Sequence, residues 1–471
     1  MKTTMRLFTV CLAILIVPAI AAAKIKTKNL ASTTQQTASI AFDPAGLPHA
    51  AYQGTDYGLY HARFDGKIWW REKIDDTQYY GNSIAIDSQG RIHIVYGAER
   101  INGTATYQLM HAYYNGGSWQ LTALLSEEGN PKFNPRIALD AAGRPRVLFL
   151  ENAGYRYATY NGTSWQFEDT GLPWGWYSDG FALDAAGHAH VCYSVNYSGS
   201  FYATNASGSW VATQLSDGSA GATAIDLDAA GRPRVVTAEG GVLILHSFDG
   251  ANWSHETMLD FSDAAPGITA LFEPHIAMEI DENGRPRIMS GLYLTSGTGY
   301  ANTAAFVFDN GVFWNALLVD RKGGFYPDIA LDRQGDAVVT YCGALKGGNT
   351  TKTKWARIIL PDLTGTWAQL ELNGSTVAGT LHITNQGLDK SGKARVTLWL
   401  SDDAILDDTD TELPEFLRLK SLKPGAMVSL PVELTSAGAI AGRYLIAVID
   451  PDFIVPDSSW ADNLVPALLN P

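Results

Sequence analysis

A short pattern returns seven times along this chain and constrains its fold more than any other feature. In its fullest form the pattern is Ser-x-Ala-x-Asp-x-x-Gly, and a glycine stands three residues after the aspartate in every copy. The repeat aspartates are Asp43, Asp87, Asp140, Asp184, Asp228, Asp281 and Asp332. A tryptophan closes each of the first six copies, at Trp69, Trp119, Trp165, Trp210, Trp253 and Trp314. Repetition at intervals of 44 to 53 residues predicts an array of similar small units that bury one another.

The third copy shows how one unit is expected to fold. An alternating run ends at Asp140, which accepts hydrogen bonds from the turn that it opens, and Gly143 supplies the positive φ of that turn. Two further alternating runs follow, and the Asn161-Gly162 hairpin signal stands before a last strand that begins at Trp165. Four short strands form a sheet that cannot bury its own faces. Seven such sheets in a ring predict an all-β, seven-bladed β-propeller.

The seventh copy lacks its last strand. It has Asp332 and Gly335, but no Gly-x-x-Trp strand precedes the change of character at Pro361. Residues 24–32 precede the first copy and belong to no unit. We expect this segment to pair with the strand around 354–360 and to complete the seventh blade, because the pairing removes two exposed sheet edges.

Residues 1–23 have the pattern of an export signal. Lys2 and Arg6 precede an apolar run, and three alanines end this run at Ala23. We expect a mature chain with the propeller over 24–360 and a second domain over 361–471, secreted or held at the cell surface. No later segment approaches the roughly 18 apolar residues of a membrane-spanning helix, so we expect no transmembrane segment.

The C-terminal region of short strands and turns is typical of a β-sandwich. Its most specific motifs are Asn385-x-Gly387, Leu398-Trp-Leu-Ser401-x-Asp403, Asp407-x-x-Asp410, Gly442-x-Tyr444 and Asp450-Pro-Asp452. On these motifs the region resembles the CARDB domain, an immunoglobulin-like module of bacterial surface and secreted proteins. The resemblance implies a C-terminal immunoglobulin-like β-sandwich that serves adhesion or attachment rather than a reaction.

The repeats themselves resemble the sialidase-like (BNR-type) repeats of bacterial proteins. Their units read Ser-x-Ala-x-Asp-x-x-Gly-x-Pro-His, and the first copy matches with Asp43-x-x-Gly46-x-Pro48-His49. This resemblance implies the propeller fold but no activity. The segment 161–165 matches the sialidase Asp-box only in part, and no motif of this chain identifies the arginine triad of sialidases.

The charge of the chain limits its partners. The formal net charge is −14, and no basic stripe is available to neutralise phosphates, which excludes nucleic acid as a partner. For an exported protein of this kind we expect an extracellular glycan or a cell-surface protein as the partner.

Aromatic residues gather where the last strand of one blade crosses to the first strand of the next, and we predict a carbohydrate-binding face at these crossings. Aromatic rings stack on sugars, and neighbouring carboxylates accept hydroxyl hydrogen bonds. The predicted ligand-binding residues are Tyr79, Tyr80, Trp174, Trp176, Tyr177, Phe272, Glu273, Phe325 and Tyr326. The alternative for the rings seven residues before the repeat aspartate is that they pack between adjacent blades. For Trp174 and Trp176 the sequence is equally compatible with packing and with exposure for ligand binding.

Two carboxylates depart from the repeat on the innermost strands. Two residues before the repeat aspartate five copies have alanine, but the fifth and sixth copies have Asp226 and Glu279. A buried carboxylate is costly unless it is paired, hydrated or bound to a cation. We predict that these two form a catalytic acid/base pair of the kind that glycosidases use. The alternative is a hydrated channel lining with arginine neighbours such as Arg232 or Arg285.

Two features suggest metal ions. His49, His93 and His190 recur at one repeat position, which favours a structural role over metal ligation. Asp403, Asp407 and Asp410 lie in an acidic loop whose hard oxygens suit Ca²⁺, although a solvated loop explains the same residues. Apart from this possible Ca²⁺ we expect no cofactor.

Two classes of function follow from these patterns. One is an exported binding or adhesion protein whose propeller recognises extracellular carbohydrate or a surface protein. The alternative is a polysaccharide lyase or glycoside hydrolase with its site at the propeller axis. The lack of a linear catalytic motif favours binding. A cluster of Asp226 and Glu279 with Tyr, His or Arg side chains would favour the enzyme.

Overall fold

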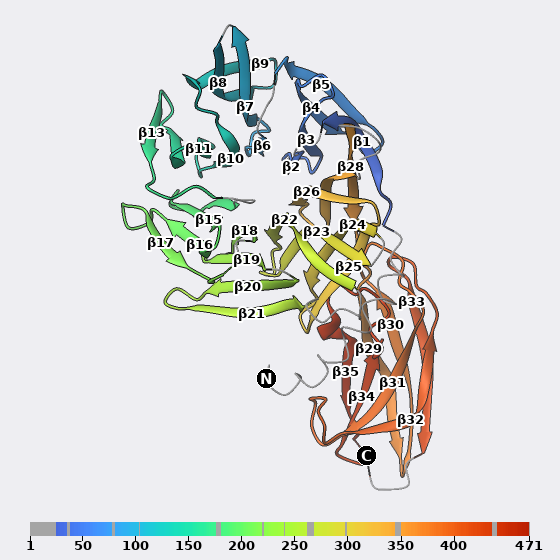
Figure 1. Ribbon diagram of the computed structural model, residues 1–471. Coiled ribbons are helices and arrows are strands. Elements are labelled where there is room, and N and C mark those ends of the chain that lie inside the picture. The colour runs from blue at the N-terminus through green and yellow to red at the C-terminus, as the bar shows by residue number, and fades with distance from the viewer. Residues whose placement is uncertain are drawn as a thin grey trace. The chain divides into compact units, whose positions relative to one another are not determined.

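A computed structural model gives the three-dimensional structure of this chain (Figure 1). The structure describes residues 25–34, 38–77, 81–102, 104–175, 180–218, 221–239, 241–260, 268–296, 299–343, 350–435 and 440–470. Over these residues all regular elements are strands apart from one 3₁₀ turn, so the predicted all-β class is confirmed. The chain divides into two compact units, one with Ile25–Val307 and Leu318–Ile358, the other with Phe308–Leu317 and Ile359–Pro471.

Seven four-stranded sheets occupy the first stretch of the described chain up to Ile358. The first sheet consists of β2 (Ser39–Phe42), β3 (Pro48–Gln53), β4 (Leu59–Phe64) and β5 (Trp69–Asp75). The second consists of β6 (Asn82–Ile86), β7 (Ile92–Asn102), β8 (Thr104–Tyr114) and β9 (Trp119–Glu128). The third consists of β10 (Phe133–Leu139), β11 (Pro145–Glu151), β12 (Gly154–Tyr160) and β13 (Trp165–Asp169). The fourth and fifth consist of β14 (Gly180–Leu183), β15 (Ala189–Val195), β16 (Gly199–Thr204) and β17 (Val211–Gln214); and β18 (Ala222–Leu227), β19 (Pro233–Glu239), β20 (Val242–Phe248) and β21 (Trp253–Asp260). The last two consist of β22 (Ile268–Ile280), β23 (Pro286–Ser296), β24 (Gly299–Asp309) and β25 (Trp314–Asp320); and β26 (Gly323–Leu331), β27 (Ala337–Gly343), β28 (Thr350–Ile358) and β1 (Lys28–Thr34).

The first strands of these sheets contact one another in a closed cycle. The order of the cycle is β2, β6, β10, β14, β18, β22, β26 and again β2. Figure 1 shows these strands near the centre of the ring, with the later strands of each sheet fanning outwards. Sheets arranged in this way around a common axis form a β-propeller.

The seventh sheet joins the two ends of the propeller sequence. Strand β1 pairs antiparallel with β28, so that Lys28 lies opposite Trp355 and Thr34 lies opposite Thr350. Leu30 of β1 is fully buried and packs in one core cluster with Trp355 of the seventh sheet and Trp69 of the first. Strand β1 therefore covers the outer edge of β28 and contributes to the core between the seventh and first sheets.

The repeat aspartates organise the turns after the first strands. In all seven copies one carboxylate oxygen accepts hydrogen bonds from the backbone amides two and four residues further on. In the third sheet Asp140 receives the amides of Ala142 and Arg144, and its other oxygen lies 2.9 Å from Arg146 Nη2. Gly143 has φ +72°, which explains the fixed glycine.

The C-terminal stretch forms two sheets that share a core. One contains β29 (Leu363–Asn373), β30 (Thr376–Asn385) and β33 (Met427–Thr435); the other contains β31 (Ala394–Ser401), β32 (Thr411–Leu419), β34 (Tyr444–Ile449) and β35 (Leu464–Leu468), and the 3₁₀ turn covers Trp460–Asn463. Fully buried residues from both sheets, such as Leu381 and Val396, belong to one hydrophobic cluster. A Cβ atom on Gly365 would lie 2.6 Å from Val465 of the facing sheet, so the two layers are closely packed. This arrangement is a two-layered β-sandwich.

No helix in the described part of the chain is long and apolar enough to cross a membrane. The residues predicted as an export signal lie outside the described residues.

Candidate functional site

The side chains along the innermost strands are small, with few exceptions. Positions two and four residues before the repeat aspartate lie on one side of the strand, because the side chains of a strand alternate between its two faces. At the first of these positions the small residues are Ala41, Ala85, Ala138, Ala182 and Ala330. At the second they are Ser39, Ser83, Gly180, Ala224 and Ala277. The exceptions are Asp226, Glu279, Arg136 and Asp328, one on each of four sheets.

Charge interactions show that these exceptions face the axis. The guanidinium of Arg136, on the third sheet, interacts with Asp328 on the seventh sheet and with His275 on the sixth. Neither of these sheets is a neighbour of the third in the ring, so the interactions run across the central channel. Glu279 interacts with Asp226 and with Asp328 on the two adjoining sheets. We call these five residues the axial cluster.

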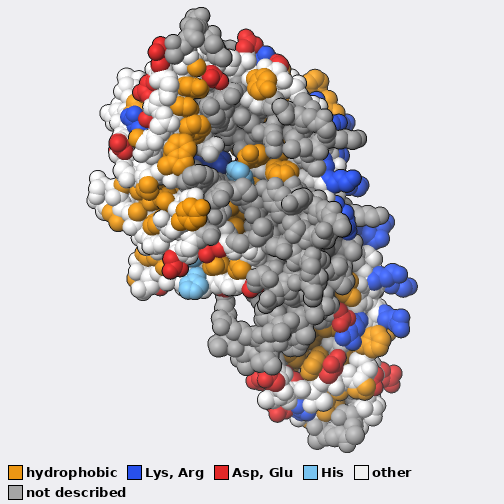
Figure 2. Space-filling model, viewed as in Figure 1, with side chains coloured by type: hydrophobic (Ala, Val, Ile, Leu, Met, Phe, Trp, Pro, Cys, Tyr) orange, Lys and Arg blue, Asp and Glu red, His pale blue; other side chains and the backbone are white. Residues whose placement is uncertain are grey.

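Figure 2 shows the ring in the same view, with a histidine side chain and basic side chains in the hollow at its centre. The members of the axial cluster keep partial contact with solvent. They also lie deep enough for burial to be the main cause of their pKa shifts. Partial exposure of a side chain that is surrounded by protein is what the wall of a narrow channel produces.

Hydrogen bonds link two of the carboxylates to neighbouring strands. Asp226 Oδ2 accepts from the backbone nitrogen of Ile280 at 2.8 Å, and Oδ1 accepts from Leu227 at the same distance. Because Ile280 directly follows Glu279, the carboxylate of Asp226 lies beside the peptide unit that carries Glu279. Asp328 Oδ2 accepts in the same way from Ile40 of the first sheet at 2.9 Å.

The surroundings of the axial cluster shift the pKa values of its titratable side chains. Burial raises the pKa of Asp226 to about 6, against the hydrogen bonds from Ile280 and Leu227, and raises that of Asp328 to about 6. Burial together with the negative charges of Asp226 and Asp328 raises the pKa of Glu279 well above its usual range. Burial and the charge of Arg136 lower the pKa of His275 to about 3. At neutral pH Asp226 is mostly ionised and the imidazole of His275 is neutral, whereas burial and the two neighbouring negative charges favour the protonated form of Glu279.

The backbone is distorted where the innermost strands enter the ring. Six residues before the repeat aspartate, Asn134 has φ +43° and Tyr326 has φ +49°, and Gly81 at the same repeat position has φ +93°. The strand pairing shifts between Phe325 and Asp328 and at the corresponding places of β10 and β22. The ring of Tyr326 lies 4.3 Å from that of His275. A bulky residue with positive φ costs on the order of 1 kcal/mol, and such strain concentrates at functional sites.

The structure brings together Asp226 and Glu279, the two carboxylates predicted from the sequence, and adds Arg136, His275 and Asp328. The sequence contains a signal for Arg136 and Asp328, since both replace a small residue four positions before the repeat aspartate. His275 lies within the shift of strand pairing between Phe272 and Ile276 of β22, a feature that the sequence pattern did not reveal.

The predicted aromatic face has a different outcome. Trp174 is half-buried, packs edge-on against Phe133 at 5.2 Å and lies against the core cluster that contains Leu172 and Tyr155. Phe325 and Tyr326 lie on β26 and are half-buried. Tyr79, Tyr80, Trp176 and Tyr177 lie outside the described residues, as do the side chains of Phe272 and Glu273. Of the face as predicted, only Tyr326 is seen to join the axial cluster, through its contact with His275.

The recurring histidines are structural. His49 Nδ1 lies 2.9 Å from His61 Nε2, and burial lowers the pKa of His49 to about 4. His190 Nδ1 lies 2.7 Å from the hydroxyl of Tyr202. Over the described residues no group of three or more His, Cys, Asp or Glu side chains is close enough to hold a metal ion.

The acidic loop of the sandwich uses its carboxylates in turns. Asp403 Oδ1 accepts from the amide of Ile405 at 2.7 Å, and Asp407 Oδ1 accepts from the amide of Thr409 at 2.8 Å. Asp410 Oδ2 accepts from the amide of Asp407 at 2.8 Å. Among the described residues these three carboxylates are not grouped closely enough to hold a metal ion as they stand, and Ca²⁺ binding here stays a prediction.

No family model matches the chain. No curated protein matches it either. Solved structures with a similar fold include a mutant of the Aleuria aurantia lectin in complex with Fucα1-6GlcNAc, which is 15% identical over 61% of this chain and 96% of that one, with a TM-score of 0.41. Another is the α-L-arabinofuranosidase Arb93A from Fusarium graminearum, 10% identical over 71% and 98% of the two chains, with a TM-score of 0.42. A third is the intramolecular trans-sialidase from Ruminococcus gnavus, 11% identical over 71% and 97%, with a TM-score of 0.41.

These comparisons concern the fold only. The resemblances to BNR-type repeats and to the CARDB domain are based on the sequence motifs alone. By its own strand topology the chain is an all-β protein with a β-propeller and a β-sandwich.

Proposed function

We propose that this protein is an exported glycoside hydrolase that cleaves extracellular carbohydrate at the axial cluster of its propeller. The observation that carries the proposal is the juxtaposition of Asp226 and Glu279, joined through the amide of Ile280, in a channel that raises the pKa of both carboxyl groups. Two carboxyl groups in different protonation states are the requirement of glycoside hydrolysis.

Each carboxyl group has a defined role in this reaction. Glu279 gives its proton to the glycosidic oxygen as the bond to the anomeric carbon breaks. Asp226 is ionised above pH 6 and either removes a proton from the attacking water or attacks the anomeric carbon itself, after which water releases the sugar. In both routes one water molecule is consumed, and the proton lost by Glu279 is restored.

The other members of the cluster support this chemistry. The negative charge of Asp328 helps to hold Glu279 in its protonated form. Neutral His275 and the guanidinium of Arg136 offer hydrogen bonds to sugar hydroxyls, and the ring of Tyr326 beside His275 offers an apolar surface to a sugar face.

The test is release of reducing ends from a panel of polysaccharides and aryl glycosides by the chain without residues 1–23. We expect Glu279→Gln and Asp226→Asn to lower the rate at least about 10³-fold, while Glu282→Gln, an exposed carboxylate in the following turn, leaves it unchanged. A single cooperative thermal transition well above the assay temperature would show that each variant is folded. Cleavage that survives both substitutions would remove the proposed roles.

A second candidate is an exported binding or adhesion protein for an extracellular glycan or a cell-surface protein, with the CARDB-like region as the attachment module. The observation that favours it is the structural use of Asp226 and Asp328, whose carboxylates already receive backbone amides of the next sheet. Saturable binding of a glycan without any release of reducing ends would select this candidate.

A further inference from the structure

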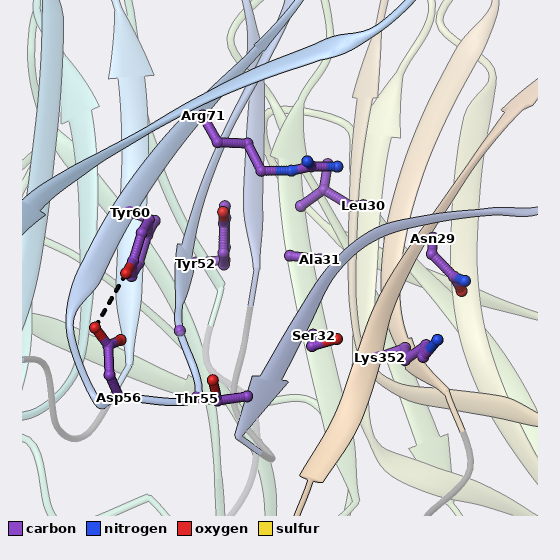
Figure 3. A pocket seen from close by; sticks show the side chains of 11 residues that line it. Asn29, Leu30, Ala31, Ser32, Tyr52, Thr55, Asp56, Tyr60, Arg71 and Lys352 are labelled. Carbon is purple, nitrogen blue, oxygen red and sulfur yellow. Dashed lines mark hydrogen bonds between the residues drawn. The ribbon is translucent and has the colours of Figure 1, made fainter.

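A groove outside the axial cluster lies where the ring is closed (Figure 3). It encloses about 410 Å³, and one wall is the stretch Asn29–Ser32 of β1. The opposite wall comes from the first sheet, and Lys352 is contributed by β28. The polar side chains that concern the argument are Ser32, Tyr52, Asp56, Tyr60, Arg71 and Lys352.

Two tyrosines form the aromatic part of the groove. The rings of Tyr52 and Tyr60 stack at 5.5 Å with an angle of 17° between their planes. Tyr52 is only 3% exposed, and no protein group in the described residues hydrogen-bonds to its hydroxyl. Burial raises its pKa to about 12, so the hydroxyl stays a donor at neutral pH. Figure 3 shows this hydroxyl pointing to the side from which Arg71 extends, whereas Tyr60 points to Asp56.

The charges of the groove are not balanced. The carboxylate of Asp56 accepts from Lys73 Nζ at 2.8 Å and from the hydroxyl of Tyr60 at 3.0 Å, and Lys73 Nζ also lies 2.9 Å from Asp76. Arg71 and Lys352 form no ion pair with any described residue, and both are exposed. Both residues line the groove, and Figure 3 shows Arg71 extending above Tyr52 and Lys352 on the side of β28, with its nitrogen turned away from the two tyrosines. The groove is therefore locally cationic, although the whole chain carries a net charge of −14.

We infer that this groove binds a carboxylate-bearing sugar, a hexuronic acid unit of an acidic polysaccharide. The planar guanidinium of Arg71 suits a carboxylate in a bidentate geometry. The hydroxyls of Tyr52 and Ser32 face the sugar hydroxyls, and the ring of Tyr60 supplies an apolar surface. Charges more than about 10 Å away are screened at 0.1 M salt, so the local cations decide the preference rather than the net charge.

This binding site depends on the closure of the ring. Asn29–Ser32 form a wall of the groove only while β1 pairs with β28. A ligand that binds the closed ring and not the open one stabilises the closed form. The site is separate from the axial cluster, and its ligand binding does not require cleavage at the axis.

The experiment is isothermal titration of the chain, without residues 1–23, with galacturonate and glucuronate trisaccharides. Neutral trisaccharides of the same size and sodium acetate serve as the comparison ligands. We expect one of the uronates to bind and to raise the melting temperature, and the neutral sugars and acetate to bind at least tenfold more weakly. Arg71→Gln should weaken uronate binding at least tenfold, and Tyr52→Phe should weaken it severalfold.

The control for charge is Arg63→Gln, which removes an exposed arginine of β4 that does not line the groove and should leave the affinity unchanged. Equal binding of the neutral trisaccharides, or acetate competing as well as the uronate, would overturn the inference and indicate an unspecific site. No uronate binding at all would also overturn it. Glu279→Gln should bind the uronate normally, so that loss of cleavage and loss of groove binding are distinguished.

Discussion

Asp226 of β18 accepts a hydrogen bond from the backbone amide of Ile280 in β22, with 2.8 Å between Oδ2 and the nitrogen. Comparable ties join Asp328 to Ile40 at 2.9 Å and Ser83 to Ile137 at 3.3 Å. Each of them connects the first strand of one sheet to the first strand of the next. The carboxylate that we propose for catalysis is thus also part of the packing around the axis, and its two roles are separable by substitution.

The hydrogen bond from the amide of Ile280 to Asp226 gives a prediction about stability. Asp226→Ala leaves the amides of Ile280 and Leu227 without their acceptor and should cost about 1–3 kcal/mol in the free energy of unfolding. Asp226→Asn keeps an oxygen acceptor and should cost less. Denaturant titration of both variants provides the measurement. Equal losses for Ala and Asn would contradict a role for the hydrogen bonds.

The raised pKa of Asp328 gives a prediction about pH. Its folded-state pKa is about 6 against an ordinary value of 3.8, so the unfolded chain releases this proton first as the pH rises. The contribution of this group to stability is complete below about pH 4 and is lost as the pH rises through 6. From pH 4 to 7 the wild type should lose about 1–2 kcal/mol relative to Asp328→Asn, less than the full shift implies because the side chain keeps solvent contact. Parallel stability profiles of the two proteins would refute this.

Closure of the ring by β1 is testable through Leu30. This side chain is fully buried in the cluster with Trp355 and Trp69, so Leu30→Ala should cost about 2–5 kcal/mol. Asn29→Ala, on an exposed neighbour in the same strand, should change stability by less than about 0.5 kcal/mol. The comparison is made by thermal and denaturant unfolding. A loss below about 1 kcal/mol for Leu30→Ala would show that β1 is not part of the core.

Calcium binding at the acidic loop of the sandwich is testable by chelation. Because Asp403, Asp407 and Asp410 accept hydrogen bonds within the turns of the loop, we expect a chelator to leave the melting temperature of the chain unchanged. Differential scanning calorimetry with and without added Ca²⁺ provides the measurement. A lower melting temperature after chelation that disappears in Asp407→Asn would instead establish a calcium site.

The features that the sequence determined are local. Asp140 organises its turn through Ala142 and Arg144, within four residues along the chain, so the Asp-x-x-Gly pattern reveals the turn directly. Seven such turns with alternating runs between them were enough to predict the all-β class. The sequence also predicted that segment 24–32 pairs around 354–360. The structure pairs Lys28–Thr34 with residues 350–355 of the same strand, so the partner strand is the predicted one and the pairing is shifted toward its start.

The site was less accessible from the sequence. Asp226 and Glu279 stand where five of the seven repeats have alanine, and this departure from the repeat identified them as two axial carboxylates. Trp174 was not distinguishable from a binding residue, since only the packing of Phe133 against it shows that it is half-buried.

Only the tertiary structure decided which residues meet at the axis. Arg136 and Asp328 belong to the third and seventh sheets, and their interaction across the channel exists only when the ring is closed. His275 and Tyr326 contact each other, and each lies within a shift of strand pairing that breaks the simple alternation of side chains. Turns depend on hydrogen bonds between near neighbours in the chain, whereas electrostatic coupling depends on distance in space, and that distance is set by the packing of all the sheets together.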